Sequence, residues 1–599
     1  MKYIVKVALP VLLAMACAST PALAKDKKPN VLVVLFDDVG FSGIGAYGSD
    51  ARTPRIDSIA QRGALLSRYY TSPFCGPTRA MLMTGKDNHE VGMGTLVETT
   101  TERMRGAPGY SMRWHANQQT IATMLSRGGY QTYVTGKWGI GEVGANLPHK
   151  FGFQRSYVMD ATGGGNYDAK PYLPGSHSVE WFEDGKPVNL PEDFYSSRTL
   201  VDKMIEYVGA GDPDRPFFAY LSLQAAHMPI QVPTEYVDRY EGVFDRGWDV
   251  MRQEQLTRAI ALGLVPPETK LAPVPETHRP WDDLSPNEKA YAARSMQVNA
   301  GMMEAADYHI GRLLDYLKKN GQLENTIVVV LSDNGAESGQ TSMEGPANLA
   351  LDAVKMIERF DTSYENLGQR RSVTAVGPEW ASVLSAPFDL YKFYGSEGAL
   401  RVPFVIAGPG IADVGVKHAP VHVADLVPTI LDAADLPYEP DQFYGKSVLP
   451  MLSGNSDTTY KDDESFAFEV SGNAALYRGK WKITRNTPPN GDSTWRLYDI
   501  SLDPGETTDL SNDNPDLFKD MLAEYETYAQ RVGVLEISED ESAFKLLEKN
   551  LIKKSVSKYW PYMMGFIFAI GGLIFFIFSL IIAFHKRNLF SRRDVDSLS

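Results

Sequence analysis

The chain has 599 residues, of which 43% are apolar and 22% charged, and it contains two cysteines. The length allows several domains, and the apolar fraction is typical of globular proteins, which excludes a disordered or collagen-like chain. Two cysteines also exclude a disulfide-stabilised scaffold. The net charge of −15 argues against a nucleic-acid-binding protein, since such proteins carry a basic surface. It leaves the charge of any single pocket open.

The first residues of the chain have the pattern of a secretory signal peptide. Two lysines precede a short apolar run, and a small–x–small motif ends at Ala24. We therefore expect residues 1–24 to be removed on export. A lipoprotein signal that is processed at Cys17 is the alternative. If cleavage follows Ala24, the mature chain keeps a single cysteine, Cys75, which has no intrachain partner.

Apolar, β-branched runs recur along the body of the chain and predict buried parallel strands. They lie at Asn30–Asp38, Gln131–Lys137, Phe217–Gln224, Thr326–Asp333 and Val402–Ile406. Helical patterns such as Asn299–Lys319 and Ala424–Ala434 lie between them. This alternation predicts an α/β fold with a large, mostly parallel mixed sheet that is flanked by helices. Ligands of such sheets bind beyond the carboxyl ends of the strands.

A different pattern begins near residue 461. Short strand-like segments within Ala474–Asp499, followed by a helical pattern at Pro515–Gln530, predict a smaller antiparallel sheet with a C-terminal helix. Upstream, Tyr236–Asn287 is rich in charged residues, proline and tryptophan. We interpret this segment as a surface insertion that walls a pocket.

The run Trp560–Phe584 contains no charged residue and is long enough to predict a single C-terminal transmembrane helix. Apolar residues at helical spacing among the preceding lysines predict an amphipathic juxtamembrane segment. The sequence thus predicts an exported protein, on the periplasmic or extracellular face, that is anchored in the inner membrane. The expected segments are a signal peptide at 1–24, an α/β domain at 25–460, an antiparallel-sheet subdomain at 461–533, a juxtamembrane segment at 534–558, a transmembrane helix at 559–585 and a cytoplasmic tail at 586–599.

Four oxygen-bearing side chains follow two of the predicted strands. Asp37 and Asp38 end the first strand, and Asp333 and Asn334 end another. Because the carboxyl ends of parallel strands meet at one edge of a sheet, these side chains should lie together. Their oxygens suit Ca²⁺ or Mg²⁺ and not zinc. The alternative is that they cap helices and turns, which is the usual role of Asp and Asn at such positions.

Several candidate cations accompany a cysteine at other strand ends. A proline two residues after Cys75 suits the first turn of a helix, so we expect Cys75 at a helix N-terminus, where free N–H groups attract anions. Arg79 adds a fixed positive charge. Lys137, His227 and Lys392 also follow predicted strands or lie close behind them. Singly, each is explained as a solvated or core side chain, whereas together they can neutralise a tetrahedral anion.

These residues resemble a known family. CGPTR, which starts at Cys75, resembles the C-x-P-x-R signature of type I sulfatases, and FDDVG, GKW, the histidine of AAHMP, SDNG and EGALRVP follow the family's order and spacing. GWDVMRQEQLTRAIALGLVP followed by WDDL resembles the bacterial arylsulfatase branch. The resemblance covers about residues 28–532. It implies the alkaline-phosphatase-like fold, with 25–460 as the catalytic domain.

By this resemblance, a formylglycine-generating enzyme oxidises Cys75, and the aldehyde hydrates to a diol. One hydroxyl attacks the sulfur of a small-molecule or saccharide sulfate ester, and the second hydroxyl then drives elimination of sulfate. An unmodified Ser or Cys would instead leave a stable covalent ester.

The resemblance also assigns roles to the individual candidates. Arg79 would stabilise charge, Lys137 and Lys392 would bind sulfate oxygens, and Lys392 or His227 would protonate the leaving oxygen. The implied ligands of Ca²⁺, in preference to Mg²⁺, are Asp37, Asp38, Cys75 in its modified form, Asp333 and Asn334.

One position departs from the family's pattern. The family usually reads GKWHxG, whereas this chain reads GKWGIG, so Gly139 replaces a histidine that helps to deprotonate the diol. Such a group is typically worth roughly 10²–10⁴-fold in rate. We therefore expect slow turnover, a shifted role or a substitute base, for which Glu142 and His149 are the nearest candidates in sequence. The sequence predicts that Gly139→His raises the rate of sulfate release.

Three other functions are open on sequence alone. A phosphatase, phosphodiesterase or phosphonate hydrolase can use the same scaffold, because sulfate and phosphate esters share their shape. Gly139 also fits a membrane-tethered protein that binds sulfated ligands without turnover. A GxGxxG motif at Gly43–Gly48 points weakly to a nucleotide-dependent oxidoreductase. Asp37 and Asp38 stand just before that motif, where they would repel a pyrophosphate.

Overall fold

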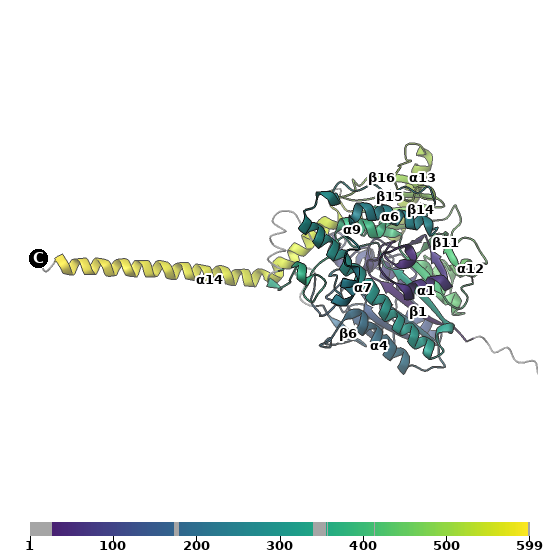
Figure 1. The fold of residues 1–599 in the computed structure, drawn as a ribbon, viewed down its shortest axis with the longest axis horizontal. Helices are drawn as coiled ribbons and strands as arrows, with labels where there is room; N and C mark the ends of the chain where they lie inside the picture. The colour runs from purple at the N-terminus through teal and green to yellow at the C-terminus, as the bar shows by residue number, and fades with distance from the viewer. Residues whose placement is uncertain are drawn as a thin grey trace, which may run out of the picture.

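The computed structural model describes residues 27–172, 179–339, 355, 357–412, 414–538 and 540–596. The predicted signal peptide at 1–24, including Cys17, lies outside these residues. Figure 1 shows a body built around a central sheet and a long helix that leaves it.

A mixed sheet forms the centre of the body. Among the described residues its ten strands are β1 Asn30–Phe36, β2 Ala64–Leu66, β4 Gln131–Lys137, β5 Arg155–Met159, β6 Trp181–Glu183, β7 Lys186–Pro187, β8 Phe217–Ser222, β9 Thr326–Ser332, β10 Phe404–Ala407 and β11 Gly415–Lys417. Their spatial order is β11-β2-β10-β9-β1-β8-β4-β5-β6-β7. β9, β1, β8, β4 and β5 run parallel, while β10 is antiparallel to β9 and β6 to β5. The predicted α/β architecture is confirmed.

Helices cover both faces of this sheet. They are α1 Pro54–Arg62, α2 Cys75–Thr84, α3 Ile121–Arg127, α4 Ser196–Ala210, α5 Thr234–Val237, α6 Gly247–Ala261, α7 Pro286–Lys319, α9 Pro378–Ser385, α10 Glu397–Leu400, α11 Leu426–Ala433 and α12 Leu449–Leu452. Leu32 and Val34 of β1 pack in one buried cluster with α4 and α7, whereas Val31 and Val33 pack in another with α2, α3 and α11. Burial on both faces explains why the parallel strands are continuous apolar runs.

The predicted smaller sheet is also present. β13 Ser465–Val470, β14 Asn473–Arg478, β15 Trp481–Arg485 and β16 Trp495–Asp499 pair antiparallel in that order. The helix α13 Pro515–Val532 packs on this sheet in a separate apolar cluster. A further short pair of strands, β3 Tyr69–Tyr70 with β12 Val421–His422, packs in the same buried cluster as Val31 and Val33 of β1.

The segment that we interpreted as a surface insertion is in fact packed into the body. It contains α6, and the ring of Trp248 lies with its centroid 4.7 Å from that of Trp281 and 5.6 Å from that of Trp380 on α9. These three rings are buried. Trp248 and Arg279 also line a cavity of about 470 Å³, so the segment does wall a hollow.

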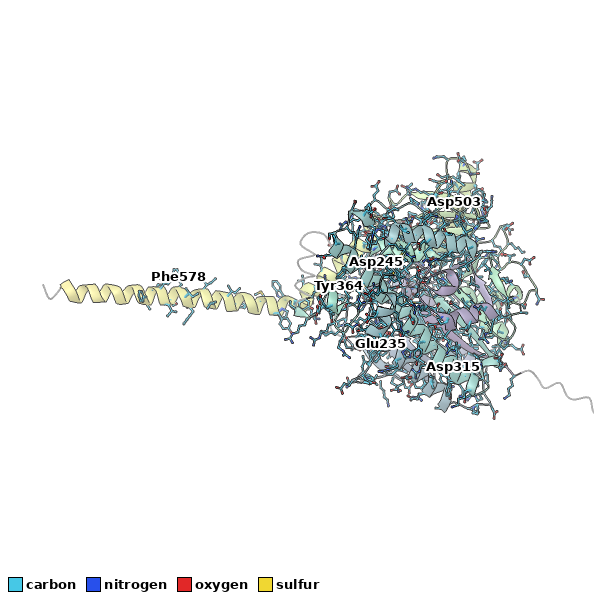
Figure 2. The ribbon with its side chains drawn as sticks, viewed as in Figure 1. Glu235, Asp245, Asp315, Tyr364, Asp503 and Phe578 are labelled. Carbon is cyan, nitrogen blue, oxygen red and sulfur yellow. The ribbon has the colours of Figure 1, made fainter. Side chains whose placement is uncertain are left out.

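The C-terminal helix corrects the prediction of a membrane span. α14 runs over Ala543–Asp596 and projects from the body, with Phe578 on the projecting part (Figures 1 and 2). Within the described part of the chain, no helix combines the length and the apolarity that crossing a membrane requires. The predicted transmembrane helix at 559–585 is therefore wrong. The prediction rested on the length of this run and its lack of charge, which do not by themselves establish a membrane span.

Candidate functional site

The strand-end acids meet as the sequence predicts. Asp37 and Asp38 follow β1, Asp333 and Asn334 follow the adjacent β9, and all four are buried. The backbone N–H of Asp38 donates to Asp333 Oδ1 at 3.1 Å, and Asn334 Nδ2 donates to Asp38 Oδ1 at 2.6 Å. Asp38 takes a left-handed φ of 63°, which turns the chain at the strand end.

Cys75 joins this cluster from α2. It is the first residue of the helix, in agreement with the position of Pro77, and its side chain is buried. Its sulfur and one carboxylate oxygen each of Asp37 and Asp333 all lie within 4.8 Å of one another. Burial raises the pKa of the Cys75 thiol, so this group is a poor thiolate nucleophile as it stands.

Two cations from neighbouring elements are held by these acids. Arg79, one helical turn after Cys75, donates from Nε to Asp333 Oδ2 at 2.8 Å and from NH1 to the Lys137 carbonyl and to Ser222 Oγ. Lys137, at the end of β4, places Nζ 2.8 and 2.7 Å from the two carboxylate oxygens of Asp37. Burial alone would lower the pKa of Lys137, but the Asp37 charge raises it above its ordinary value. Both cations therefore stay charged.

Lys392 and His227 both lie close to Asp38. Lys392 Nζ lies 2.9 Å from Asp38 and donates to Glu337 Oε2 at 2.6 Å, and despite burial these two carboxylates raise its pKa well above the ordinary value. His227 Nε2 lies 3.5 Å from Asp38 Oδ2, and its Nδ1 contacts the carbonyl oxygen of Met228. Burial and the charge of Lys137 hold the pKa of His227 well below its ordinary value, so the imidazole is neutral.

The structure adds residues that the sequence did not single out. Glu337 pairs with Lys392, and the ring of Tyr172 lies edge-on to His227 with centroids 5.1 Å apart. Gln224 is buried just beyond β8, and both polar atoms of its amide lack a hydrogen-bond partner among the described residues. Glu337 was within reach of sequence reasoning, since it is a carboxylate three residues after Asn334, whereas Tyr172 carries no such signal.

The donor set fits a hard divalent cation. Asn334 Oδ1 is buried and has no hydrogen-bond partner within the described structure, so a strong acceptor is left over where the carboxylates converge. An unpaired buried acceptor is costly unless a ligand satisfies it. Carboxylate and amide oxygens are the ligands that Ca²⁺ prefers, and Asp37, Asp38, Asp333 and Asn334 supply them.

Gly139 lies beside this cluster in a left-handed conformation. Its φ is 60°, and a Cβ at this position would lie 3.2 Å from Lys137 Cε and 3.4 Å from the carbonyl oxygen of Ala161. The two candidate substitutes for the missing histidine have partners of their own. Glu142 accepts from Arg113 Nε at 2.9 Å, and the His149 ring lies against the turn at Gly185.

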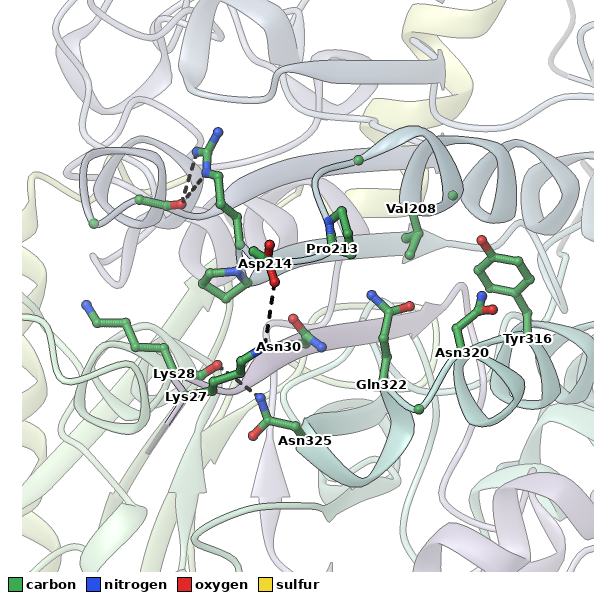
Figure 3. Close-up of a pocket in the computed structure, with 17 residues that line it drawn as sticks. Lys27, Lys28, Asn30, Val208, Pro213, Asp214, Tyr316, Asn320, Gln322 and Asn325 are labelled. Carbon is green, nitrogen blue, oxygen red and sulfur yellow. Dashed lines mark hydrogen bonds and ion pairs between the residues drawn. The ribbon is translucent and has the colours of Figure 1, made fainter. Parts of the chain in front are cut away.

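The opposite end of the sheet contains a cavity of about 740 Å³ (Figure 3). Its lining includes Asn30, Asp214 and Asn325, which lie at the amino ends of β1, β8 and β9. A strand of this length separates the cavity from the acid cluster by roughly 20 Å. The cavity is therefore not part of the candidate site.

Comparisons with known proteins agree with the geometry. Residues 29–436 match the sulfatase family model, and residues 388–528 match a model described as N-sulphoglucosamine sulphohydrolase, C-terminal. An uncharacterized sulfatase of Schizosaccharomyces pombe is 34% identical over 558 residues, which cover 88% of this chain and 99% of that protein. The arylsulfatase of Klebsiella aerogenes is 34% identical over 457 residues, which cover 75% and 95%.

Solved structures share the fold. The crystal structure of Ps i-CgsB in complex with k-i-k-neocarrahexaose has a TM-score of 0.60 at 25% identity and covers 84% of this chain and 93% of its own. The family model spans more than half of the chain, and the similar proteins include arylsulfatases and steryl-sulfatases. The chain belongs to the sulfatase family, and it is a sulfuric ester hydrolase.

Proposed function

We propose that the protein acts as an arylsulfatase-like enzyme whose nucleophile is formylglycine derived from Cys75 and whose metal is Ca²⁺. The observation that carries this proposal is the place of Cys75, buried at the start of α2 among the oxygens of Asp37 and Asp333. A thiol with a raised pKa contributes little nucleophilicity there. Conversion of the thiol to an aldehyde would place a nucleophile precursor at this position.

The groups that the site would hold supply two kinds of chemistry. A hydrated formylglycine at residue 75 offers one hydroxyl for attack on sulfur and a second for release of sulfate. Ca²⁺, held by Asp37, Asp38, Asp333 and Asn334, would polarise the sulfate oxygens.

The remaining residues bind and orient the sulfate. Arg79 is fixed by three acceptors, so its guanidinium presents a charge that cannot move when the substrate arrives. Lys137 and Lys392 keep their protons and contact different acids of the cluster, Asp37 and Asp38, where each can donate to a sulfate oxygen. Charge that develops in the transition state is thus met by donors that are already in place.

Proton transfer to the leaving oxygen falls to Lys392 in this proposal. Lys392 is protonated because Asp38 and Glu337 raise its pKa. His227 is neutral, so it lacks the extra proton that a charged imidazolium would donate. His227 then serves to orient the site, with Nδ1 at the Met228 carbonyl and Nε2 facing Asp38.

The substrate class and the surroundings are also part of the proposal. The similar arylsulfatase and the k-i-k-neocarrahexaose in complex with Ps i-CgsB support a small-molecule or saccharide sulfate ester. The signal-like pattern that ends at Ala24 supports export, and modification of Cys75 requires a formylglycine-generating enzyme as partner.

The test is a mass measurement of the peptide that contains Cys75, from protein made in its native host, together with parallel assays. We expect formylglycine at residue 75 and release of sulfate from an aryl sulfate, with little phosphate from the matching aryl phosphate and no sulfate release by Cys75→Ala. An intact thiol in actively hydrolysing protein contradicts the mechanism. Faster phosphate release identifies a phosphatase, and sulfate-ester binding without release identifies a binding protein.

A further inference from the structure

Three aromatic rings connect the C-terminal helix to the catalytic candidates. The ring of Phe544, in the first turn of α14, lies with its centroid 4.9 Å from that of Phe393, which in turn lies 4.9 Å from that of Phe74. Phe74 directly precedes Cys75, and Phe393 directly follows Lys392. A residue near the end of the chain is thus packed onto the neighbours of both groups.

Phe393 needs this packing to hold its conformation. Its φ of 84° is in the left-handed region, which costs energy for a residue with a bulky side chain. The backbone N–H of Phe393 donates to the Pro73 carbonyl at 3.2 Å, and its ring lies 5.4 Å from Lys392 Nζ. The Phe393 ring therefore lies close to both the Lys392 ammonium and the Phe544 ring.

The first part of the helix that carries Phe544 is docked on the body. Asn550 Nδ2 donates to the Glu98 carbonyl at 2.8 Å, and Lys554 Nζ donates to Glu98 Oε1 at 3.2 Å. Further along, the Tyr559 hydroxyl donates to Glu358 Oε1 at 2.6 Å. Ala543 and Leu551 are buried against the body. Because these contacts span four turns, the position of Phe544 is set by the whole docked segment 543–559.

We propose that Phe544 is a positioning residue for sulfate hydrolysis, which acts through Phe393 on Lys392. This inference rests on the proposed function, since it is Lys392 that binds the sulfate and protonates the leaving oxygen there. Removal of the Phe544 ring leaves a gap beside a strained residue, and Phe393 moves toward it. A displacement of the ammonium by about 1 Å is enough to cost up to roughly 10²-fold in rate.

The experiment compares three variants in the full-length, calcium-loaded and formylglycine-containing protein. We expect Phe544→Ala to lower kcat on an aryl sulfate by about tenfold and to raise KM by up to about fivefold, in line with the weaker sulfate binding expected below. Phe544→Leu refills the gap and should recover most of the loss. Phe518→Ala removes a half-buried ring of α13 that contacts a separate cluster, and it should leave kcat unchanged. A kcat for Phe544→Ala within about twofold of the wild type overturns the inference.

A binding measurement separates this inference from the proposed function. Calorimetry with inorganic sulfate reports the position of Lys392 without turnover, and we expect Phe544→Ala to weaken sulfate binding about fivefold while Phe518→Ala does not. If the wild type binds sulfate but hydrolyses no sulfate ester, the proposed function fails while this result still supports positioning by Phe544. If Phe544→Ala and Phe518→Ala change kcat and sulfate affinity equally, Phe544 contributes only to packing and the inference is overturned. If Phe544→Ala does not fold, Phe544→Leu decides by the same two readouts, with a smaller loss expected.

Discussion

Each buried cation of the site is paired with a carboxylate that a metal ion would also use. Lys137 pairs with Asp37, Lys392 with Asp38, and Arg79 with Asp333. A buried charge without a partner costs several kcal/mol, so these pairs allow the site to fold before any ligand is bound. In the proposed mechanism, the carboxylates would bind the metal ion and the cations would bind the sulfate oxygens of the substrate. The pairing thus keeps the cations oriented for a role that begins only with the substrate.

Gly139 shows why restoring the family histidine is not a simple gain. A residue other than glycine at φ 60° pays roughly 1–2 kcal/mol, and its Cβ would lie 3.2 Å from Lys137 Cε, whose ammonium is already held by Asp37. We now expect Gly139→His to hydrolyse aryl sulfates no faster than the wild type, contrary to the expectation from sequence. Initial sulfate-release rates decide, with Gly139→Ala as the control that adds only the Cβ. A faster Gly139→His enzyme would show that the backbone adapts.

At the scale of elements, the loop that carries Lys392 is tied to the small sheet by buried charges. Lys482 of β15 places Nζ 3.1 Å from Glu397 Oε1 and 2.8 Å from Glu506 Oε1, and Glu506 accepts from the backbone N–H of Glu397. Glu397 begins α10, five residues after Lys392. The small sheet is thereby linked by buried ion pairs to the loop that carries the candidate residue Lys392.

Removal of the Lys482 ammonium should lower the free energy of unfolding. Lys482→Met strands two buried carboxylates, and breaking a buried pair costs about 3–5 kcal/mol. Burial raises the pKa of Glu506, so this carboxylate takes up a proton more readily than a surface glutamate does. We therefore expect a loss of about 3 kcal/mol, the lower end of that range. Urea unfolding measures the loss. Lys480→Met, which removes a half-exposed lysine 2.7 Å from Asp499, should cost less than about 1 kcal/mol; equal losses would contradict the role of burial.

A second buried cluster joins the loop after α2 to β13 and α13. His89 lies with Nδ1 3.1 Å from Asp87 Oδ1 and Nε2 3.0 Å from Glu469 Oε2, and the Tyr528 hydroxyl donates to Asp87. Burial opposes the charged imidazole, but the two carboxylates outweigh it and raise the pKa of His89 to about 9. The cluster is therefore held together by an imidazolium at neutral pH.

This cluster predicts a pH dependence of stability. Because the folded-state pKa of His89 lies above its ordinary value of 6.5, its contribution is complete below pH 6.5 and is lost as the pH rises through 9. We expect the free energy of unfolding to fall over this range by up to about 3 kcal/mol. His89→Gln should flatten the fall, while His115→Gln, at an exposed position, should leave it unchanged. A wild-type profile that is flat between these pH values would refute the charged state of His89.

At the scale of the whole molecule, the sequence predicted what is local and missed what depends on distant contacts. Asp37 and Asp333 were found because the end of an apolar run is visible in the chain itself. The helical spacing of Phe544 and Leu551 showed that they share a face, but not that the body of the enzyme covers it. Tyr172 reaches His227 through a loop that has no sequence signature. The wrong prediction of a membrane span at Trp560–Phe584 rested on the length and lack of charge of one run, and no described helix meets the requirements of a span.

The proposed calcium site would couple the candidate active site to the stability of the whole fold. Its proposed ligands follow β1 and β9, two adjacent inner strands of the sheet, and an ion that binds only the folded chain stabilises it by about 2.7 kcal/mol at one hundred times its Kd. We expect a chelator to abolish sulfate release and to lower Tm, and Ca²⁺ to restore both. Asp333→Asn, which removes one ligand charge, should lose most of this response to Ca²⁺. Asp315→Asn, on the surface of α7 (Figure 2), should keep it. Because the two readouts depend on the same ion, an enzyme that keeps its full rate and Tm in chelator would show that these carboxylates serve only to hold Arg79, Lys137 and Lys392.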